Sequence, residues 1–145
     1  IIVRERIKAA FKQIPQAIGM NNHQGSVATS DFRLMNFIAE VLKEENKFFV
    51  DSRTTPETVA EKVMRSWRIP FAQRNVFLDN DSEEEKIMAQ LESLANIAER
   101  DGYAIGIGHV KKSTLEVLKI KIPDLINEGF VFENVSKIIA VNSVN

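Results

Sequence analysis

The chain has 145 residues, of which 44% are hydrophobic and 27% are charged, a composition typical of one globular domain with a substantial core rather than of a disordered protein. Its 19 lysines and arginines nearly balance 20 aspartates and glutamates, so no overall positive charge favours nucleic acid or an anionic membrane as a partner. Cysteine is absent, which excludes disulfides, thiolate metal sites and a cysteine nucleophile.

The sequence gives little direct information about the cellular location of the protein. No apolar run approaches the roughly 20 residues that span a bilayer, and the first residues lack the charged and apolar regions of a signal peptide. Ile1 is not an initiator methionine. We therefore expect residues upstream of this segment, an export signal among them, and a protein of the cell envelope or periplasm; a cytoplasmic location is the alternative.

Apolar residues follow helical and strand spacing in turn along the chain, and caps or turn formers separate the segments. In chain order the predicted elements are a helix over 1–13, a strand over 17–20, a helix over 32–44, a strand over 47–50, a helix over 55–67, a strand over 71–78, a helix over 82–101, a strand over 103–108, a helix over 113–128 and a strand over 130–135. This alternation predicts an α/β fold with parallel strands, because each helix is the crossover that returns the chain to the same end of the sheet.

Local signals mark several helix ends. Ser30-Asp31 offers an N-cap, and Thr55-Pro56 places a cap before a proline at the first helical position. Ser82–Glu85 matches the capping box, and Gly102 suits the left-handed residue that follows a helix. Pro123 predicts a break in the last long helix.

Four side chains that can bind metal or transfer protons lie just past successive predicted strands: His23, Asp51, Asp79 and His109. Ligands of parallel α/β folds bind at the carboxyl ends of the strands. We therefore predict that both histidines line one cleft, with the two aspartates on the same rim and Arg53 within reach of one of them. Strand ends three positions apart lie roughly 10–15 Å from each other, so we expect at most one histidine, His23, to bind a metal directly.

Simpler interpretations compete with these assignments. A lone histidine is more often a surface or core residue satisfied by hydrogen bonds, and the shared position after strands is what favours a site. A carboxylate beside an arginine keeps a low pKa, which suits Asp51 to metal ligation or to orienting a histidine. Asp79-Asn80-Asp81 lacks the rest of a calcium loop and favours an Asx turn. The glycines of 106–108 do not have phosphate-loop spacing.

Four ordered motifs resemble the divergent polysaccharide deacetylase family. They are Gly19–Ser26, which contains Asn21-Asn22-His23, then Phe48–Thr55, Val76–Asp81 and Ala104–His109. The resemblance implies the distorted (β/α) barrel of the polysaccharide deacetylase superfamily. It covers essentially the whole chain but not the paired aspartates and the histidine-bearing strand with which members begin. Residues 1–145 are therefore expected to form a single domain that is the carboxyl-terminal portion of such a barrel.

The resemblance also implies a function. Enzymes of the superfamily remove N- or O-acetyl groups from sugars with a divalent metal, so we expect a carbohydrate deacetylase-like hydrolase that acts on an acetylated polysaccharide or peptidoglycan-like glycan. A zinc ion there would polarise the acetyl carbonyl and lower the pKa of a bound water toward roughly 7. The alternative is a non-catalytic glycan-binding envelope protein that retains the fold.

Roles for individual residues follow from the same resemblance. His109 is similar to the late histidine that protonates the leaving amine or alkoxide, and Asp51 with Arg53 is similar to a polar pair that orients such a histidine. The expected site consists of His109, Asp51 and Arg53 as catalytic residues, Asn22 and Asp79 as substrate-binding residues, and His23 as a metal ligand.

Overall fold

The computed structural model describes residues 2–142, which form two compact units. The described part of unit 1 comprises residues 2–73 and 139–142, and unit 2 comprises residues 74–138. Each unit has a hydrophobic core of its own. Because compact units of this kind also occur inside one domain, the single domain over 1–145 stays a prediction.

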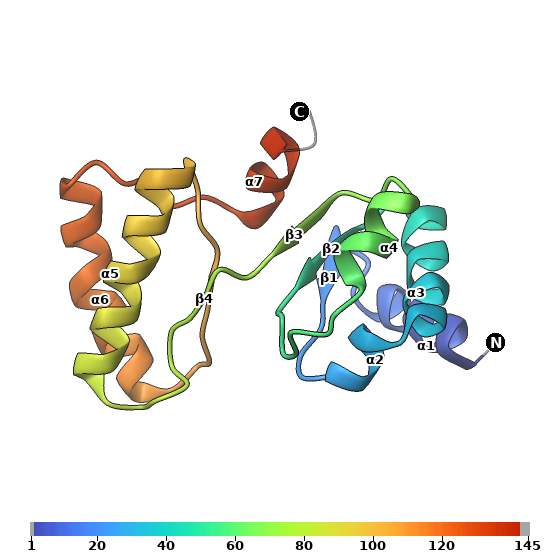
Figure 1. The fold of residues 1–145 in the computed structure, drawn as a ribbon, viewed down its shortest axis with the longest axis horizontal. Helices are drawn as coiled ribbons and strands as arrows, with labels where there is room; N and C mark the ends of the chain where they lie inside the picture. Colours follow the sequence, from blue (N-terminus) through green and yellow to red (C-terminus); the bar gives the residue numbers. More distant parts are fainter. Residues whose placement is uncertain (1, 143–145) are drawn as a thin grey trace. The chain divides into compact units, whose positions relative to one another are not determined.

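Unit 1 is built on a three-stranded parallel sheet in the order β1-β2-β3 (Figure 1). Its elements are α1 (Ile2–Gln13), β1 (Gly19–Asn21), α2 (Ser26–Ser30), α3 (Phe32–Glu44), β2 (Phe48–Asp51), α4 (Ala60–Ser66) and β3 (Phe71–Gln73). A last helix, α7 (Val135–Asn142), contains residues of both units.

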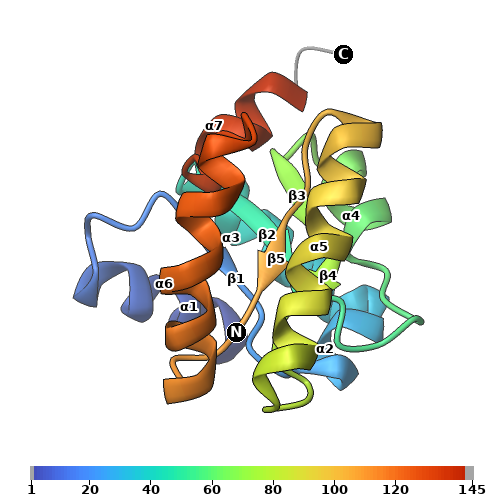
Figure 2. The same cartoon turned by 90° about the vertical axis from the view of Figure 1, so that its left-hand side faces the viewer.

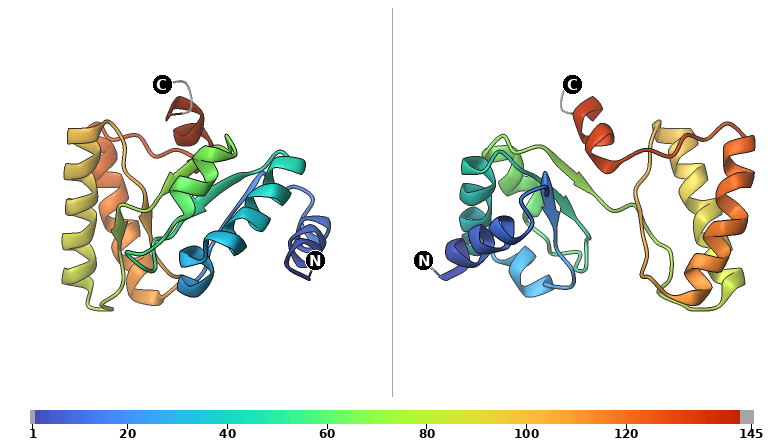
Figure 3. Two further views of the ribbon diagram at one scale, coloured as in Figure 1. Left: turned by 45° about the vertical axis from the view of Figure 1, so that its right-hand side comes forward. Right: turned by 180° about the vertical axis from the view of Figure 1, so that it is seen from behind.

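The core of unit 1 lies between one face of this sheet and its helices. Met20, Phe49 and Phe71 pair across the three strands, so their side chains share a face. Phe49 is 1% exposed, and its ring stacks on that of Phe71 with centroids 6.4 Å apart. Helices α1, α3 and α4 contribute to the same cluster, and Figure 3 shows α1 and α3 along one side of the strands.

Unit 2 contains β4 (Val76–Phe77), α5 (Glu84–Asp101), β5 (Gly106–Ile107) and α6 (Lys112–Asn127). The two strands are parallel, and α5 and α6 pack against each other, as Figure 2 also shows. The buried residues that hold the unit together come from the β4 segment and from both helices. They are Val76, Leu78, Ile87, Leu91 and Val117.

The predicted α/β fold with parallel strands is confirmed, and so are two of the helix-end signals. The Asp31 carboxylate accepts a hydrogen bond from the Leu34 amide at 2.9 Å, which caps α3. Gly102 follows α5 with φ 86°, in the left-handed region where glycine carries no Cβ penalty. Among residues 2–142, no helix combines the length and apolar character needed to cross a lipid bilayer.

The helix predicted over 55–67 does not start at Thr55-Pro56, because α4 begins at Ala60. The Thr55 hydroxyl accepts a hydrogen bond from the Glu57 amide in a turn of its own. The Thr58 hydroxyl accepts from the Ala60 amide at 3.2 Å and donates to Asp51. Side-chain bonds between nearby residues, including that of Thr58 with Asp51 seven residues earlier, therefore compete with the helix in this segment.

The capping box predicted at Ser82–Glu85 is also absent. Helix α5 starts at Glu84 after the N-cap residue Glu83, and no side chain caps it there. Asp81 accepts a hydrogen bond from the Glu83 amide at 3.1 Å and forms an ion pair with Lys86 at 2.6 Å. The acidic side chain just before the helix thus takes part of the role expected of the serine.

Three strand predictions change in extent. The strand over 17–20 shifts to Gly19–Asn21, and the strand over 103–108 shrinks to Gly106–Ile107. The strand over 71–78 divides at Arg74 and Asn75 into β3, which pairs with β2, and β4, which pairs with β5. Asn75 causes part of this change, because its side chain and backbone both bond Ile105.

The strand predicted over 130–135 does not form. Val131 is 80% exposed and Phe132 46% exposed, so this apolar run is not buried against a sheet, and α7 begins at Val135. Pro123 does not break α6 either. Buried residues on both sides of the proline, Val117 and Leu125, hold the helix together despite the missing amide.

The buried ring of Phe49 is expected to be a main source of stability in unit 1. Phe49→Ala should lower the free energy of unfolding by about 3–5 kcal/mol, because it removes a buried ring and leaves a cavity. Urea unfolding followed by circular dichroism measures this. Phe132→Ala, at an exposed phenylalanine, should cost no more than about 0.5 kcal/mol; equal losses in the two variants would contradict the assignment of the core.

Candidate functional site

In unit 1, two loops meet at the carboxyl end of the sheet. The Asn22 side chain accepts a hydrogen bond from the Ser52 amide at 2.8 Å and donates one to the Gln24 carbonyl at 3.1 Å. The Thr54 hydroxyl donates to the same Gln24 carbonyl at 3.3 Å. The amide oxygen of Asn22, a residue predicted to bind substrate, therefore holds the loop after β1 against the loop after β2, while its amide nitrogen bonds within its own loop.

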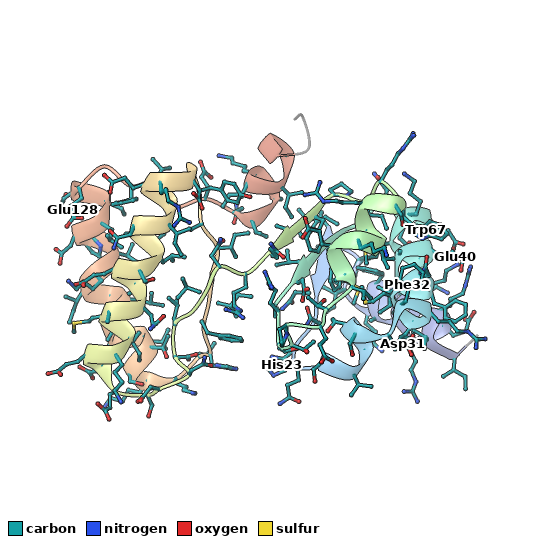
Figure 4. The ribbon with its side chains drawn as sticks, in the orientation of Figure 1. His23, Asp31, Phe32, Glu40, Trp67 and Glu128 are labelled. Carbon is teal, nitrogen blue, oxygen red and sulfur yellow. The ribbon has the colours of Figure 1, made fainter. Side chains whose placement is uncertain are left out.

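His23 lies in the middle of this bonded loop and is exposed (Figure 4). The chain turns sharply after it, because Gln24 has φ 58° and Gly25 has φ 75°. A left-handed conformation is costly for glutamine, and the bonds of Asn22 and Thr54 to this loop help to hold it. The fold thus presents a histidine at the surface on a loop that its neighbours restrain.

Asp51, at the end of β2, is fully buried. Its Oδ1 accepts a hydrogen bond from the Arg53 backbone amide at 2.8 Å, and its Oδ2 accepts one from the Thr58 hydroxyl at 2.7 Å. Arg53 has φ 48°. The predicted pair of Asp51 and Arg53 is therefore joined through the arginine backbone, and the carboxylate fixes the loop that leads to α4.

In unit 2, the structure brings Asp79 and His109 together at the carboxyl ends of β4 and β5. Oδ1 of Asp79 lies 2.9 Å from Nδ1 of His109, and Oδ2 accepts a hydrogen bond from the His109 amide at 2.7 Å. The Thr114 hydroxyl donates to Oδ2 at 2.9 Å. Asp79 is fully buried, whereas the His109 side chain is 45% exposed. This is a buried carboxylate paired with an accessible imidazole.

The charge of Asp79 depends on these partners. Burial alone would raise the pKa of its carboxyl group, but the hydrogen bonds from the His109 ring, the His109 amide and Thr114 outweigh burial and hold that pKa below its ordinary value. An ionised carboxylate only accepts hydrogen bonds. The proton between the two groups therefore sits on Nδ1 of His109, and proton transfer to a ligand falls to Nε2, on the other side of the ring.

Residues around the imidazole limit its orientation further. The ring of Phe77 lies nearly parallel to that of His109, at 7° with centroids 6.4 Å apart. The Arg74 guanidinium lies 4.3 Å from the Phe77 ring centroid, a favourable cation–π distance. The Lys111 ammonium donates to the Asp79 carbonyl at 3.3 Å. Positive and aromatic groups therefore surround the His109–Asp79 pair.

The sequence-predicted residues thus fall into two groups. Asn22, His23, Asp51 and Arg53 belong to unit 1, whereas Asp79 and His109 belong to unit 2; one cleft lined by both histidines stays a prediction. Sequence reasoning missed two hydroxyl partners of the buried aspartates. These are Thr58 and Thr114.

A divalent metal needs several ligands close together. Among the residues that the structure describes, no group of three or more histidine, aspartate or glutamate side chains could hold such an ion. His23 is exposed, but Asp51 already has both carboxylate oxygens in hydrogen bonds. The side chains of the described residues therefore do not form a complete metal site by themselves.

Comparison with known proteins decides the family. The family model for divergent polysaccharide deacetylases matches residues 2–139. The chain belongs to this family. The predicted recognition from four motifs is thereby confirmed, because the match spans nearly the whole chain. Family membership by itself assigns no role to a side chain. The roles of individual residues in this deacetylase family member therefore rest on the geometry described above.

Two curated relatives are described as uncharacterized proteins. An uncharacterized protein of Haemophilus influenzae is 37% identical over 123 residues, which make up 85% of this chain and 44% of that protein. The uncharacterized protein YibQ of Escherichia coli is 34% identical over 82% of this chain and 37% of its own length. The chain thus spans less than half the length of these curated relatives.

A solved structure shows the same fold. The crystal structure of an uncharacterized protein from Agrobacterium tumefaciens matches with a TM-score of 0.81 and 19% identity, over 83% of this chain and 49% of that one. The match confirms the predicted fold class of parallel βα repeats and is consistent with part of a distorted barrel. At this identity it supports the fold alone.

The lowered pKa of Asp79 predicts that the free energy of unfolding decreases at acidic pH. The unfolded chain binds more protons than the folded one as the pH drops, so the stability that Asp79 contributes is complete above its unfolded pKa, about 4, and is lost as pH falls through the lower folded value. Asp79→Asn should remove this component and flatten the acid limb of the free energy of unfolding. Denaturant melts between about pH 2 and 6 measure both curves.

The matched control for this experiment is Asp124→Asn, at an exposed aspartate on α6. It removes one carboxyl group from the same unit without touching the His109 contact, so its acid limb should follow that of the unsubstituted protein. An Asp79→Asn curve parallel to both would show that the pKa of Asp79 is not depressed in the folded state.

Proposed function

We propose that the protein is a carbohydrate deacetylase-like hydrolase that removes acetyl groups from a polysaccharide or cell-envelope glycan. Family membership supports an acetylated sugar as the substrate class. The cell envelope is the proposed location, because such glycans occur there. The observation that carries the proposal is the Asp79–His109 pair, which combines a buried carboxylate with an accessible ring.

Deacetylation needs a proton at the leaving group, because an amine or alkoxide leaves poorly as an anion. His109 suits this task. Its Nδ1 is held by Asp79, which orients the ring and stabilises the imidazolium form once Nε2 has taken up a proton. A water molecule would attack the acetyl carbon and lose a proton to Nε2 of His109. Nε2 would then give that proton to the sugar nitrogen or oxygen as its bond to the acetyl carbon breaks and acetate leaves. Asp79 holds the ring throughout and does not take the proton itself.

A divalent metal, with zinc as the first candidate, is part of the same proposal. His23 is the proposed ligand from this chain, because it is exposed on a loop whose backbone is restrained by Asn22 and Thr54. Residues 2–142, which the structure describes, contain no cluster of three or more such side chains that would supply the remaining ligands. Relatives are more than twice as long as the matched segment, and polypeptide of that kind is the proposed source of the other ligands.

His109→Gln should lower kcat for acetate release from acetylated glycans by about 10²–10⁴-fold, the usual range for a general acid or base. The complete protein is assayed for acetate against acetylated chitin-type and peptidoglycan-type oligosaccharides. Asp79→Asn should also lower kcat, because an amide cannot stabilise an imidazolium as a carboxylate does. Asn96→Ala, at an exposed position on α5, is the matched control and should keep full activity.

The same assay separates catalysis from glycan binding. Acetate release that is equal in the His109→Gln variant and the unsubstituted protein would contradict the role of His109. A protein that binds the oligosaccharides but releases no acetate under any metal supplement would contradict the enzyme proposal and favour a non-catalytic glycan-binding protein.

The metal proposal predicts a stoichiometry that does not depend on activity. The complete protein should retain close to one equivalent of zinc after desalting, measured by atomic emission. His23→Ala should weaken zinc binding by more than about 10–100-fold, the usual cost of losing only the hydrogen-bond partner of a ligand. Gln24→Ala changes the neighbouring side chain without removing an imidazole and is the control. Equal zinc content in all three proteins would show that His23 is not a ligand.

A further inference from the structure

Thr114 is a buried polar residue in unit 2 that the proposed proton transfer does not yet use. It lies in the first turn of α6 and is 1% exposed. Its hydroxyl donates to Oδ2 of Asp79 at 2.9 Å, the same oxygen that accepts the His109 amide. Two donors therefore hold Oδ2, and Oδ1 is turned toward the His109 ring.

The backbone around Thr114 is adapted to this contact. A Cβ at Gly108 would lie 3.3 Å from the Thr114 methyl carbon and 3.5 Å from Cβ of Leu78. A contact of 3.3 Å is tighter than most side chains allow, so a glycine at 108 lets the start of α6 approach the ends of both strands. The approach places the threonine hydroxyl at hydrogen-bond distance from the carboxylate.

We propose that Thr114 is a positioning residue for His109, acting through the Asp79 carboxylate that it holds in one rotamer. This inference rests on the proposed function for its kinetic consequence, but its structural part can be tested without activity. A carboxylate rotates readily about its last side-chain bond, whose energy profile is broad. Hydrogen bonds to Oδ2 from a backbone amide and from a buried hydroxyl remove that freedom, so the ring nitrogen meets Oδ1 in one geometry.

A purely structural role makes a different prediction. If Thr114 merely satisfies a buried charge, removal of its hydroxyl lowers the stability of unit 2 and leaves the His109 ring and the turnover of folded protein unchanged. If Thr114 positions the pair, the same change alters the environment of the ring and the chemical step. Stability is lost in both cases, so the decisive measurements are those on the imidazole and on kcat.

Two pairs of variants isolate the hydroxyl group. Thr114→Val keeps the shape of the side chain but has a methyl group in place of the hydroxyl. Thr114→Ala and Thr114→Ser differ from each other only by the hydroxyl. In the complete protein, the two variants without a hydroxyl should lower kcat by about tenfold or more with KM little changed, a typical effect of losing an outer hydrogen-bond partner. Thr114→Ser should keep most of the activity. If Thr114→Val does not fold, the alanine and serine pair decides.

The structural readout is the imidazole nitrogen spectrum of protein labelled with ¹⁵N-histidine, at a pH at which the ring is neutral. The His109 signals are those that vanish in His109→Gln. They should show the Nδ1–H form in the unsubstituted protein and in Thr114→Ser, and a shift toward tautomer averaging in Thr114→Val and Thr114→Ala. Thr29→Val is the control, because Thr29 is equally buried but donates only to the Gly25 and Ser26 carbonyls.

Failure of each proposal has its own signature. Unchanged His109 signals in both variants that lack the hydroxyl would overturn the role of Thr114, whatever the activity. An inert complete protein whose His109 signals still change would overturn the proposed function and leave the positioning role standing. Changed signals with an unchanged kcat would show that Thr114 holds the ring without serving the reaction, and would also overturn the inference.

Discussion

The buried carboxylate of Asp79 is the point on which the site of unit 2 depends. An ionised group in the interior is costly unless hydrogen bonds replace the water that it loses. Here the replacement comes from the amide and ring of His109, which follows β5, and from the hydroxyl of Thr114, which begins α6. One charge therefore draws two segments of chain, the end of β5 and the start of α6, to the end of β4. The imidazole lies at the surface because its partner lies beneath it.

In unit 1, a buried aspartate and a histidine-bearing loop are held by different contacts. Asp51 is as deeply buried as Asp79, but its oxygens bond a backbone amide and Thr58 within its own loop. The neighbouring loop, which carries His23, is held by the neutral side chain of Asn22. In unit 2 the carboxylate contacts the histidine directly, whereas in unit 1 it shapes the loop beside the one that carries the histidine. The two histidines of this chain are therefore supported by different chemistry.

Sequence patterns predicted what local periodicity and strand direction determine. Parallel strands place their carboxyl ends at one edge, and this rule was enough to expect Asp79 and His109 on one rim. The sequence assigned the orientation of His109 to Asp51 with Arg53, whereas Asp79 is the carboxylate that bonds it. It did not predict Thr114, because a threonine in a first helical turn has no periodic or capping feature that marks a partner 35 residues away. It also misjudged 130–135, an apolar run that is exposed rather than paired, because burial depends on neighbours that no local pattern specifies. The sequence thus predicted Asp79 and His109 at one edge of the sheet, but not the hydroxyl group of Thr114 that bonds Asp79.

The shortness of the pairing in unit 2 has a consequence for which changes in length the chain tolerates. Strands β4 and β5 share two residue pairs, Val76 with Gly106 and Phe77 with Ile107. The side chain of Asn75 bonds the Ile105 amide at one end of this ladder, and Asp79 bonds the His109 amide at the other. Both bonds join residues that are 30 apart in the sequence, so segments 75–79 and 105–109 pair over the same number of residues. An inserted or deleted residue within either segment would break one of these two bonds and misalign the histidine.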